Sequence, residues 1–101
     1  ILFYNLYMII KINHLGYRIL IKKPTRKEFV AYVERDNKNQ CTLFINRPVR
    51  LINTPTLAHE IVHILQYIAE ARNMDMVQEQ EHFGYLMNYI MNRVLEFEYN
   101  I

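Results

Sequence analysis

The sequence predicts an α+β fold with an N-terminal helix, a small three-stranded and mostly antiparallel sheet, and two helices that follow the sheet. Two long segments in the second half carry apolar residues at intervals of three and four, which is typical of helices. Three short stretches between residues 17 and 46 are rich in β-branched and aromatic residues and are separated by polar turns. A chain of 101 residues suits a single domain that spans residues 1–101.

The first segment is predicted to be a helix that ends near His14, followed by Gly16 as its C-cap. Its apolar residues recur at intervals of one, three and four: Leu2, Phe3, Leu6, Ile9 and Ile10. A strand is the alternative, because aromatic and β-branched residues are dense here. The apolar run is too short to span a bilayer, which takes about 20 residues, and it lacks the flanks of a signal peptide. We therefore expect this run to belong to the fold.

Three strands are expected next, over residues 17–23, 28–34 and 40–46. The first ends at Pro24, and the second alternates apolar and polar residues. The third is expected to pair with the second across the polar turn of residues 35–39. These stretches predict the three-stranded sheet.

Both later helices have recognisable limits. Asn53 or Thr54 can cap the start of the first, and Pro55 lies just inside, where its missing N–H has no consequence. We expect this helix to reach about Arg72, with an apolar stripe made of Leu57, Ile61, Ile64, Leu65 and Ile68. The last helix is expected over residues 77–98.

The pentapeptide His59-Glu60-Ile61-Val62-His63 reads HExxH and lies inside the first of these two helices. Histidines four residues apart lie on one helical face, one turn from each other, so both imidazoles can reach the same ion. Glu60 is then placed to hold and deprotonate a metal-bound water. The motif predicts a Zn²⁺ site with His59 and His63 as ligands and Glu60 as general base. The alternative is two histidines on a helix face without a ligand.

A catalytic zinc needs a third protein ligand and one open position for water. Glu70 lies too far along the same helix, and Ala69 stands where a third motif histidine would fall. The ligand should therefore come from the last helix, where Glu81 is preferred and His82 is the alternative. Gly84 favours Glu81, because a residue without a side chain lets two helices approach closely.

Tyr85 lies one turn beyond Glu81 and is a candidate donor to the oxyanion of a hydrolytic reaction. The alternative for Tyr85 is a structural hydrogen bond in the core. Gln66 or Asn88 can orient a ligand from behind by a hydrogen bond.

These motifs resemble a known family. The stretch LAHEIVH, with a glutamate in EHFGYL eighteen residues after the second histidine, is similar to zincin metallopeptidases whose third ligand is glutamate (gluzincins). The similarity is greatest to minimal zincin-like proteins of bacteriophages and mobile elements, and looser to the ImmA/IrrE peptidases. It covers roughly residues 40–92.

The resemblance implies a zincin-like fold and a zinc ion held by His59, His63 and Glu81, with Glu60 as the base. It also implies that an extended peptide lies along an edge strand near residues 41–46. The expected function is a zinc-dependent metallopeptidase. The alternative is a non-catalytic structural or adaptor protein of the same fold, such as a component of a phage particle or a host-interaction factor.

Composition limits the partners. The net charge is +2, and the one basic cluster, over residues 22–27, is shorter than the stripe typical of nucleic-acid binding. A single cysteine excludes a disulfide framework and suits a reducing compartment. We expect a cytoplasmic or virion-associated protein that binds neither nucleic acid nor membrane. Its expected partner is a peptide or protein substrate, or a protein docked at the sheet edge within a larger assembly.

Overall fold

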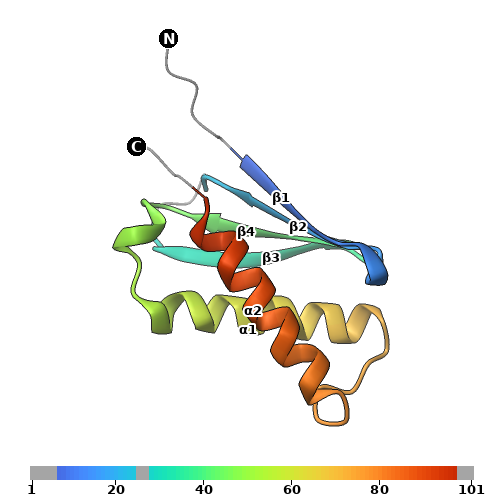
Figure 1. Cartoon of the computed structure of the whole chain (residues 1–101). Helices are drawn as coiled ribbons and strands as arrows, with labels where there is room; N and C mark the ends of the chain where they lie inside the picture. Colours follow the sequence, from blue (N-terminus) through green and yellow to red (C-terminus); the bar gives the residue numbers. More distant parts are fainter. Residues whose placement is uncertain (1–6, 25–27, 98–101) are drawn as a thin grey trace.

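The computed structural model describes residues 7–24 and 28–97, which form a four-stranded sheet and two α-helices (Figure 1). The elements are β1 (Tyr7–Ile12), β2 (Tyr17–Lys22), β3 (Ala31–Asn37), β4 (Gln40–Ile45), α1 (Thr54–Ala71) and α2 (Gln80–Leu95). The predicted α+β class is confirmed. No helix among these residues is long and apolar enough to cross a membrane.

The N-terminal helix was a wrong prediction, because residues 7–12 form strand β1; residues 1–6 lie outside the described part. Ile10 and Ile12 are buried, whereas Ile9 and Lys11 are exposed, which is the alternation of a strand. Neighbouring apolar residues fit both periods, and antiparallel pairing with β2 decides between them. Gly16, at φ 60°, ends a short 3₁₀ turn rather than a helix.

The sheet has four strands rather than the expected three, and it is mostly antiparallel, as expected. Its order is β1-β2-β4-β3, with β2 and β4 parallel and the other two neighbouring pairs antiparallel. The strand expected over residues 40–46 is confirmed as β4, and the one expected over residues 28–34 begins three residues later as β3. Because β4 pairs on both sides, the strand near residues 41–46 is not an edge. The edges among the described strands are β1 and β3, and β3 is the one next to β4. The zincin-like sheet implied by the resemblance is therefore not what the described residues form.

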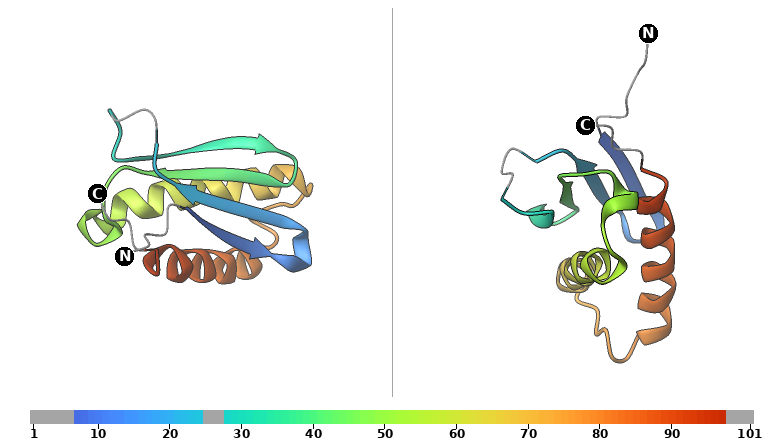
Figure 2. Two further views of the ribbon diagram at one scale, coloured as in Figure 1. Left: turned by 90° about the horizontal axis from the view of Figure 1, so that it is seen from above. Right: turned by 90° about the vertical axis from the view of Figure 1, so that its left-hand side faces the viewer.

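Both helices cover the same face of the sheet (Figures 1 and 2). α1 lies beneath β3 and β4, and α2 runs beside β1 (Figure 2). The core between the layers is aliphatic and fully buried, and its central members are Ile10, Ile19, Ile21, Leu43, Ile45, Ile61, Ile64, Ile68, Ile90 and Val94. The two helices therefore stand under opposite edges of one sheet.

Side chains satisfy backbone N–H groups at the start of α1 and in the turn before α2. The Asn53 side chain accepts a hydrogen bond from the Thr56 N–H at 2.8 Å, which confirms the expected N-cap of α1. α2 begins at Gln80 rather than at residue 77. The Asp75 side chain accepts bonds from the N–H groups of Val77 and Gln78, and this holds the preceding residues in a turn.

Arg72 fixes the end of α1 to the sheet. Its Nε donates to the Leu15 carbonyl at 2.6 Å, and its Nη2 donates to the Gly16 carbonyl at 3.1 Å. Its Nη1 donates to the Lys38 carbonyl at 3.0 Å in the turn between β3 and β4. These bonds to carbonyls of two sheet connections hold α1 in place beneath the sheet.

Candidate metal centre

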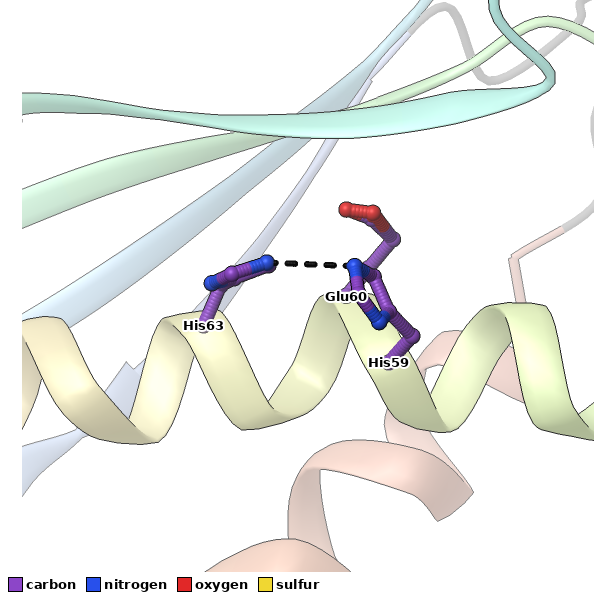
Figure 3. Close-up of side chains that lie close together, drawn as sticks. All are labelled: His59, Glu60 and His63. Atoms are coloured by element: carbon purple, nitrogen blue, oxygen red, sulfur yellow. Dashed lines mark hydrogen bonds between the residues drawn. The ribbon is translucent and has the colours of Figure 1, made fainter.

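The two histidines of the HExxH motif converge on one point above α1 (Figure 3). The Nε2 atoms of His59 and His63 are 3.2 Å apart, and their rings are nearly perpendicular, at 84°. His59 is exposed, and His63 is partly buried. Two imidazole nitrogens that meet at such a distance are suitable ligands for one transition-metal ion.

Gln66 orients one of these rings. The Nδ1 atom of His63 lies 3.3 Å from Oε1 of Gln66, an oxygen that can only accept a hydrogen bond. This contact favours the tautomer with the proton on Nδ1, so the lone pair of Nε2 points to the shared position. The expected orienting role of Gln66 thus has a matching contact.

Glu60 is the buried acid of the site. Its side chain rises from α1 toward β3 (Figure 3), and only 8% of the residue is exposed. Burial raises the pKa of the Glu60 carboxyl above its ordinary value, while the neighbouring His59 and His63 act in the opposite direction. A carboxyl with a raised pKa can accept and return a proton nearer neutral pH.

The three side chains form one group. The ligand atoms of His59, Glu60 and His63 all lie within 4.8 Å of one another, and among residues 7–24 and 28–97 this is the one cluster of at least three such groups. A site that can hold a metal ion is therefore present. Two imidazoles and a carboxylate are donors typical of zinc.

A pocket of about 580 Å³ adjoins the group on the side of the α1 N-terminus. Its walls come from the beginning of β3 and the segment before it, and from the first turns of α1. The lining residues are Phe29, Val30, Ala31, Tyr32, Pro55, Thr56, His59 and Glu60. Most of this lining is apolar, so the pocket suits a hydrophobic side chain of a bound molecule.

At the other end of the group, β3 is tied to α1. The Arg35 guanidinium donates to the Glu70 carboxylate and lies 4.7 Å from the centre of the Tyr67 ring. The outer edge of β3 has no strand partner among the described residues. This edge, which no other described strand covers, therefore runs above His59, Glu60 and His63 (Figures 1 and 3).

α2 does not bring its predicted site residues to this group. Glu81 is exposed in the first turn of α2 and is not a member of the cluster. His82 contacts His14 instead, at 2.8 Å between the two Nε2 atoms. The physical reason is the position of α2 beside β1, at the opposite edge of the sheet from β3 (Figure 2). Glu81 as third ligand stays a prediction that this arrangement does not support.

Tyr85 was predicted beside the metal, but it lies in a different pocket. It is 70% exposed and lines a cavity of about 440 Å³ with His14 and His82 beneath the end of β1. It is not among the residues that line the pocket next to Glu60. Tyr85 does lie one turn from Glu81, as the four-residue spacing predicted, but α2 packs under the other edge of the sheet.

Sequence reasoning missed the wall of the pocket. The alternation over residues 28–34 predicted a strand, but no pattern in it shows that this strand is the one above the motif.

Cys41 is the free cysteine, buried in β4, and burial raises its pKa to about 12, so it stays a thiol and offers no nucleophile or ligand.

Comparison with known protein families, with curated proteins and with solved structures gives no match. The function therefore has to be argued from the chemistry of His59, Glu60 and His63.

Proposed function

We propose that this protein is a zinc-dependent hydrolase that cleaves peptide bonds, with His59 and His63 as metal ligands and Glu60 as general base. The observation that carries the proposal is the convergence of two Nε2 atoms 3.2 Å apart beside a buried carboxylate. A site that only anchored a structural ion would gain nothing from an acid whose burial raises its pKa.

The donor set fits zinc. Zinc accepts imidazole nitrogen and carboxylate oxygen, and a catalytic zinc keeps a position for water. A bound zinc ion would lower the pKa of that water toward about 7. His59 and His63 would hold the ion, and water would fill its other positions, because α2 brings no third ligand to this group. The contact between His63 and Gln66 would set the ring orientation.

Glu60 carries the proton in this proposal. In its ionised form it accepts a proton from the attacking water and then transfers it to the nitrogen of the departing amine. Its position under β3 keeps the carboxylate away from bulk water, because 8% of the residue is exposed. For this transfer the Glu60 carboxyl has to reach both the attacking water and the amine nitrogen. Its location beside the open pocket allows this.

The edge strand β3 supports a polypeptide substrate. An extended peptide can add to an unpaired strand by backbone hydrogen bonds, which give affinity with little sequence preference. A peptide bound there would pass above the motif, and one of its side chains would face the pocket next to Pro55 and Phe29. This replaces β4 with β3 as the strand expected to bind substrate.

A second candidate is a metal-binding protein without catalytic activity, in which Glu60 is itself the third ligand. The placement of Glu81 outside the cluster favours this alternative, because Glu60 then completes the donor set. Catalysis and ligation make different demands on Glu60, so a substitution there separates the two.

The experiment is to load the purified chain and its Glu60→Gln variant with zinc and to measure metal content and cleavage of an unfolded protein. The proposal predicts equal zinc content, with cleavage lost in the variant. Zinc loss in the variant would instead support the role of Glu60 as ligand. Zinc content without cleavage in either form would contradict the hydrolase.

A further inference from the structure

A second pair of histidines meets at the opposite side of the molecule. His14, in the connection between β1 and β2, lies against His82 in the first turn of α2. Their Nε2 atoms are 2.8 Å apart, although the residues are 68 positions apart in the chain, and their ring centroids are 5.0 Å apart. The two Nε2 atoms of this pair therefore converge in the same way as those of the HExxH motif.

The far side of the His82 ring faces an acid. Nδ1 of His82 lies 3.9 Å from Oε1 of Glu79, one turn earlier. At this distance the contact is electrostatic rather than a hydrogen bond, and the negative charge favours a proton on Nδ1, which leaves the Nε2 lone pair directed at His14. His14 then supplies the proton that the two Nε2 atoms share.

We propose that His14 and His82 form a second, independent site for a divalent transition-metal ion such as Zn²⁺. When the ion binds, the proton on Nε2 of His14 passes to the solvent and Nδ1 of the same ring takes one up, so the imidazole stays neutral and both Nε2 lone pairs face the ion. Water completes the coordination shell. This site does not depend on the proposed hydrolase activity.

The geometry requires a small opening of the pair. Two nitrogens bound to one zinc at about 2.0–2.1 Å in tetrahedral geometry stand roughly 3.3 Å apart. The observed 2.8 Å is about half an ångström shorter. His14 is exposed and His82 is partly buried, so rotation of the exposed ring can supply this change.

The surroundings suit the ion in part. The adjoining cavity of about 440 Å³ has a mainly apolar floor that includes Tyr85, Leu86 and Tyr89, which limits competing polar contacts. Lys11 also lines this cavity and weakens cation binding, whereas the Glu79 carboxylate favours it. Lys11 lies beside this pair, whereas the buried Glu60 carboxylate lies beside His59 and His63, so we expect the second site to bind zinc more weakly than the HExxH site.

The consequence is structural. The start of α2 has no side-chain cap, and His82 lies in its first turn. An ion held by His14 and His82 would join this turn to the connection between β1 and β2. A ligand that binds only the folded state stabilises that state. Zinc should therefore raise the unfolding temperature through this site as well as through the HExxH site.

The test is a zinc titration of the metal-free, full-length chain by calorimetry, with His82→Gln and His14→Gln as variants. Glutamine keeps a polar side chain that can hydrogen-bond but is a poor zinc ligand. The matched control is the His59→Gln/His63→Gln pair, and circular dichroism checks that each variant is folded.

We expect two zinc equivalents in the original chain and loss of the weaker one in either His14→Gln or His82→Gln. The stronger one should disappear in the control instead. Glu79→Gln should weaken the second site by less than about tenfold, because it removes a nearby negative charge but no hydrogen bond. A single equivalent that is lost only in the control, with folded His14→Gln and His82→Gln chains unchanged, would overturn the proposal. That outcome would leave the hydrolase proposal intact.

Discussion

Two histidine pairs in this protein meet through the same atoms, yet they arise in opposite ways. His59 and His63 lie one turn apart on α1, whereas His14 and His82 come from a sheet connection and from the other helix. The first pair has the buried Glu60 between its members, and the second has Glu79 only behind one ring. The difference teaches that a shared donor geometry is not a shared chemistry: only the first pair has a buried carboxylate beside both imidazoles, which a general base would require.

The largest expected difference between the pairs is in catalysis. Replacing His59 and His63 by alanine should reduce cleavage of an unfolded protein to the uncatalysed background, because the ion is lost. Replacing His14 and His82 by glutamine should leave kcat/KM within about twofold, because that pair lies under the opposite edge of the sheet. The measurement is steady-state cleavage at saturating zinc. Equal loss in both double variants would end the functional distinction between the pairs.

The next effect concerns the acid that only the first pair possesses. Glu60→Gln should lower kcat/KM by about 10²–10⁴-fold, the usual contribution of a general base. Zinc affinity should stay unchanged, since Gln has nearly the same shape and His59 and His63 remain. Cleavage rates measured together with zinc content by elemental analysis distinguish Glu60 as general base from Glu60 as metal ligand. A large fall in metal affinity would mean that Glu60 is a ligand.

The same substitution should stabilise the metal-free protein. Burial raises the pKa of Glu60 in the folded state, so the unfolded state releases the proton more readily. As the pH rises from the unfolded-state pKa of Glu60 to its folded-state pKa, the free energy of unfolding falls. Below the unfolded-state pKa the protein keeps its full stability. Glu60→Gln should therefore have a higher unfolding temperature than the original chain at pH 7, and the difference should shrink near pH 4. A difference that is the same at both pH values would contradict the burial argument.

The smallest expected effect is at Glu81. With α2 beside β1, Glu81→Gln should change zinc affinity at the HExxH site by less than about twofold, because Glu81 is outside the cluster. Calorimetric titration of this variant in a His82→Gln background isolates the first site. A loss of about tenfold or more would restore Glu81 as third ligand and would require α2 to move.

Local patterns predicted the first pair well. Asn53 caps α1 as its side chain implies, and a four-residue spacing on a helix is enough to bring His59 and His63 together. The strands over residues 17–22 and 40–45 were likewise visible as short β-branched and aromatic stretches. In each case the information lies within a few neighbouring residues.

Non-local features could not be predicted in the same way. Strand β1 was expected as a helix, because Ile9 and Ile10 fit both periods and only pairing with β2 resolves them. The parallel pairing of β2 with β4 places β3 at the edge above the motif, and no single segment encodes that order. Because α2 lies beside β1, Tyr85 is away from the metal group and His82 contacts His14.

The most direct test of the central claim is anomalous X-ray scattering at the zinc edge from crystals of the zinc-loaded chain. The account predicts a peak about 2.0–2.1 Å from Nε2 of both His59 and His63, with the Glu60 carboxylate outside bonding distance of the ion and in contact with its water. A peak that Glu60 coordinates directly would contradict the role of Glu60 as base, and the absence of any peak at this pair would contradict the metal site itself.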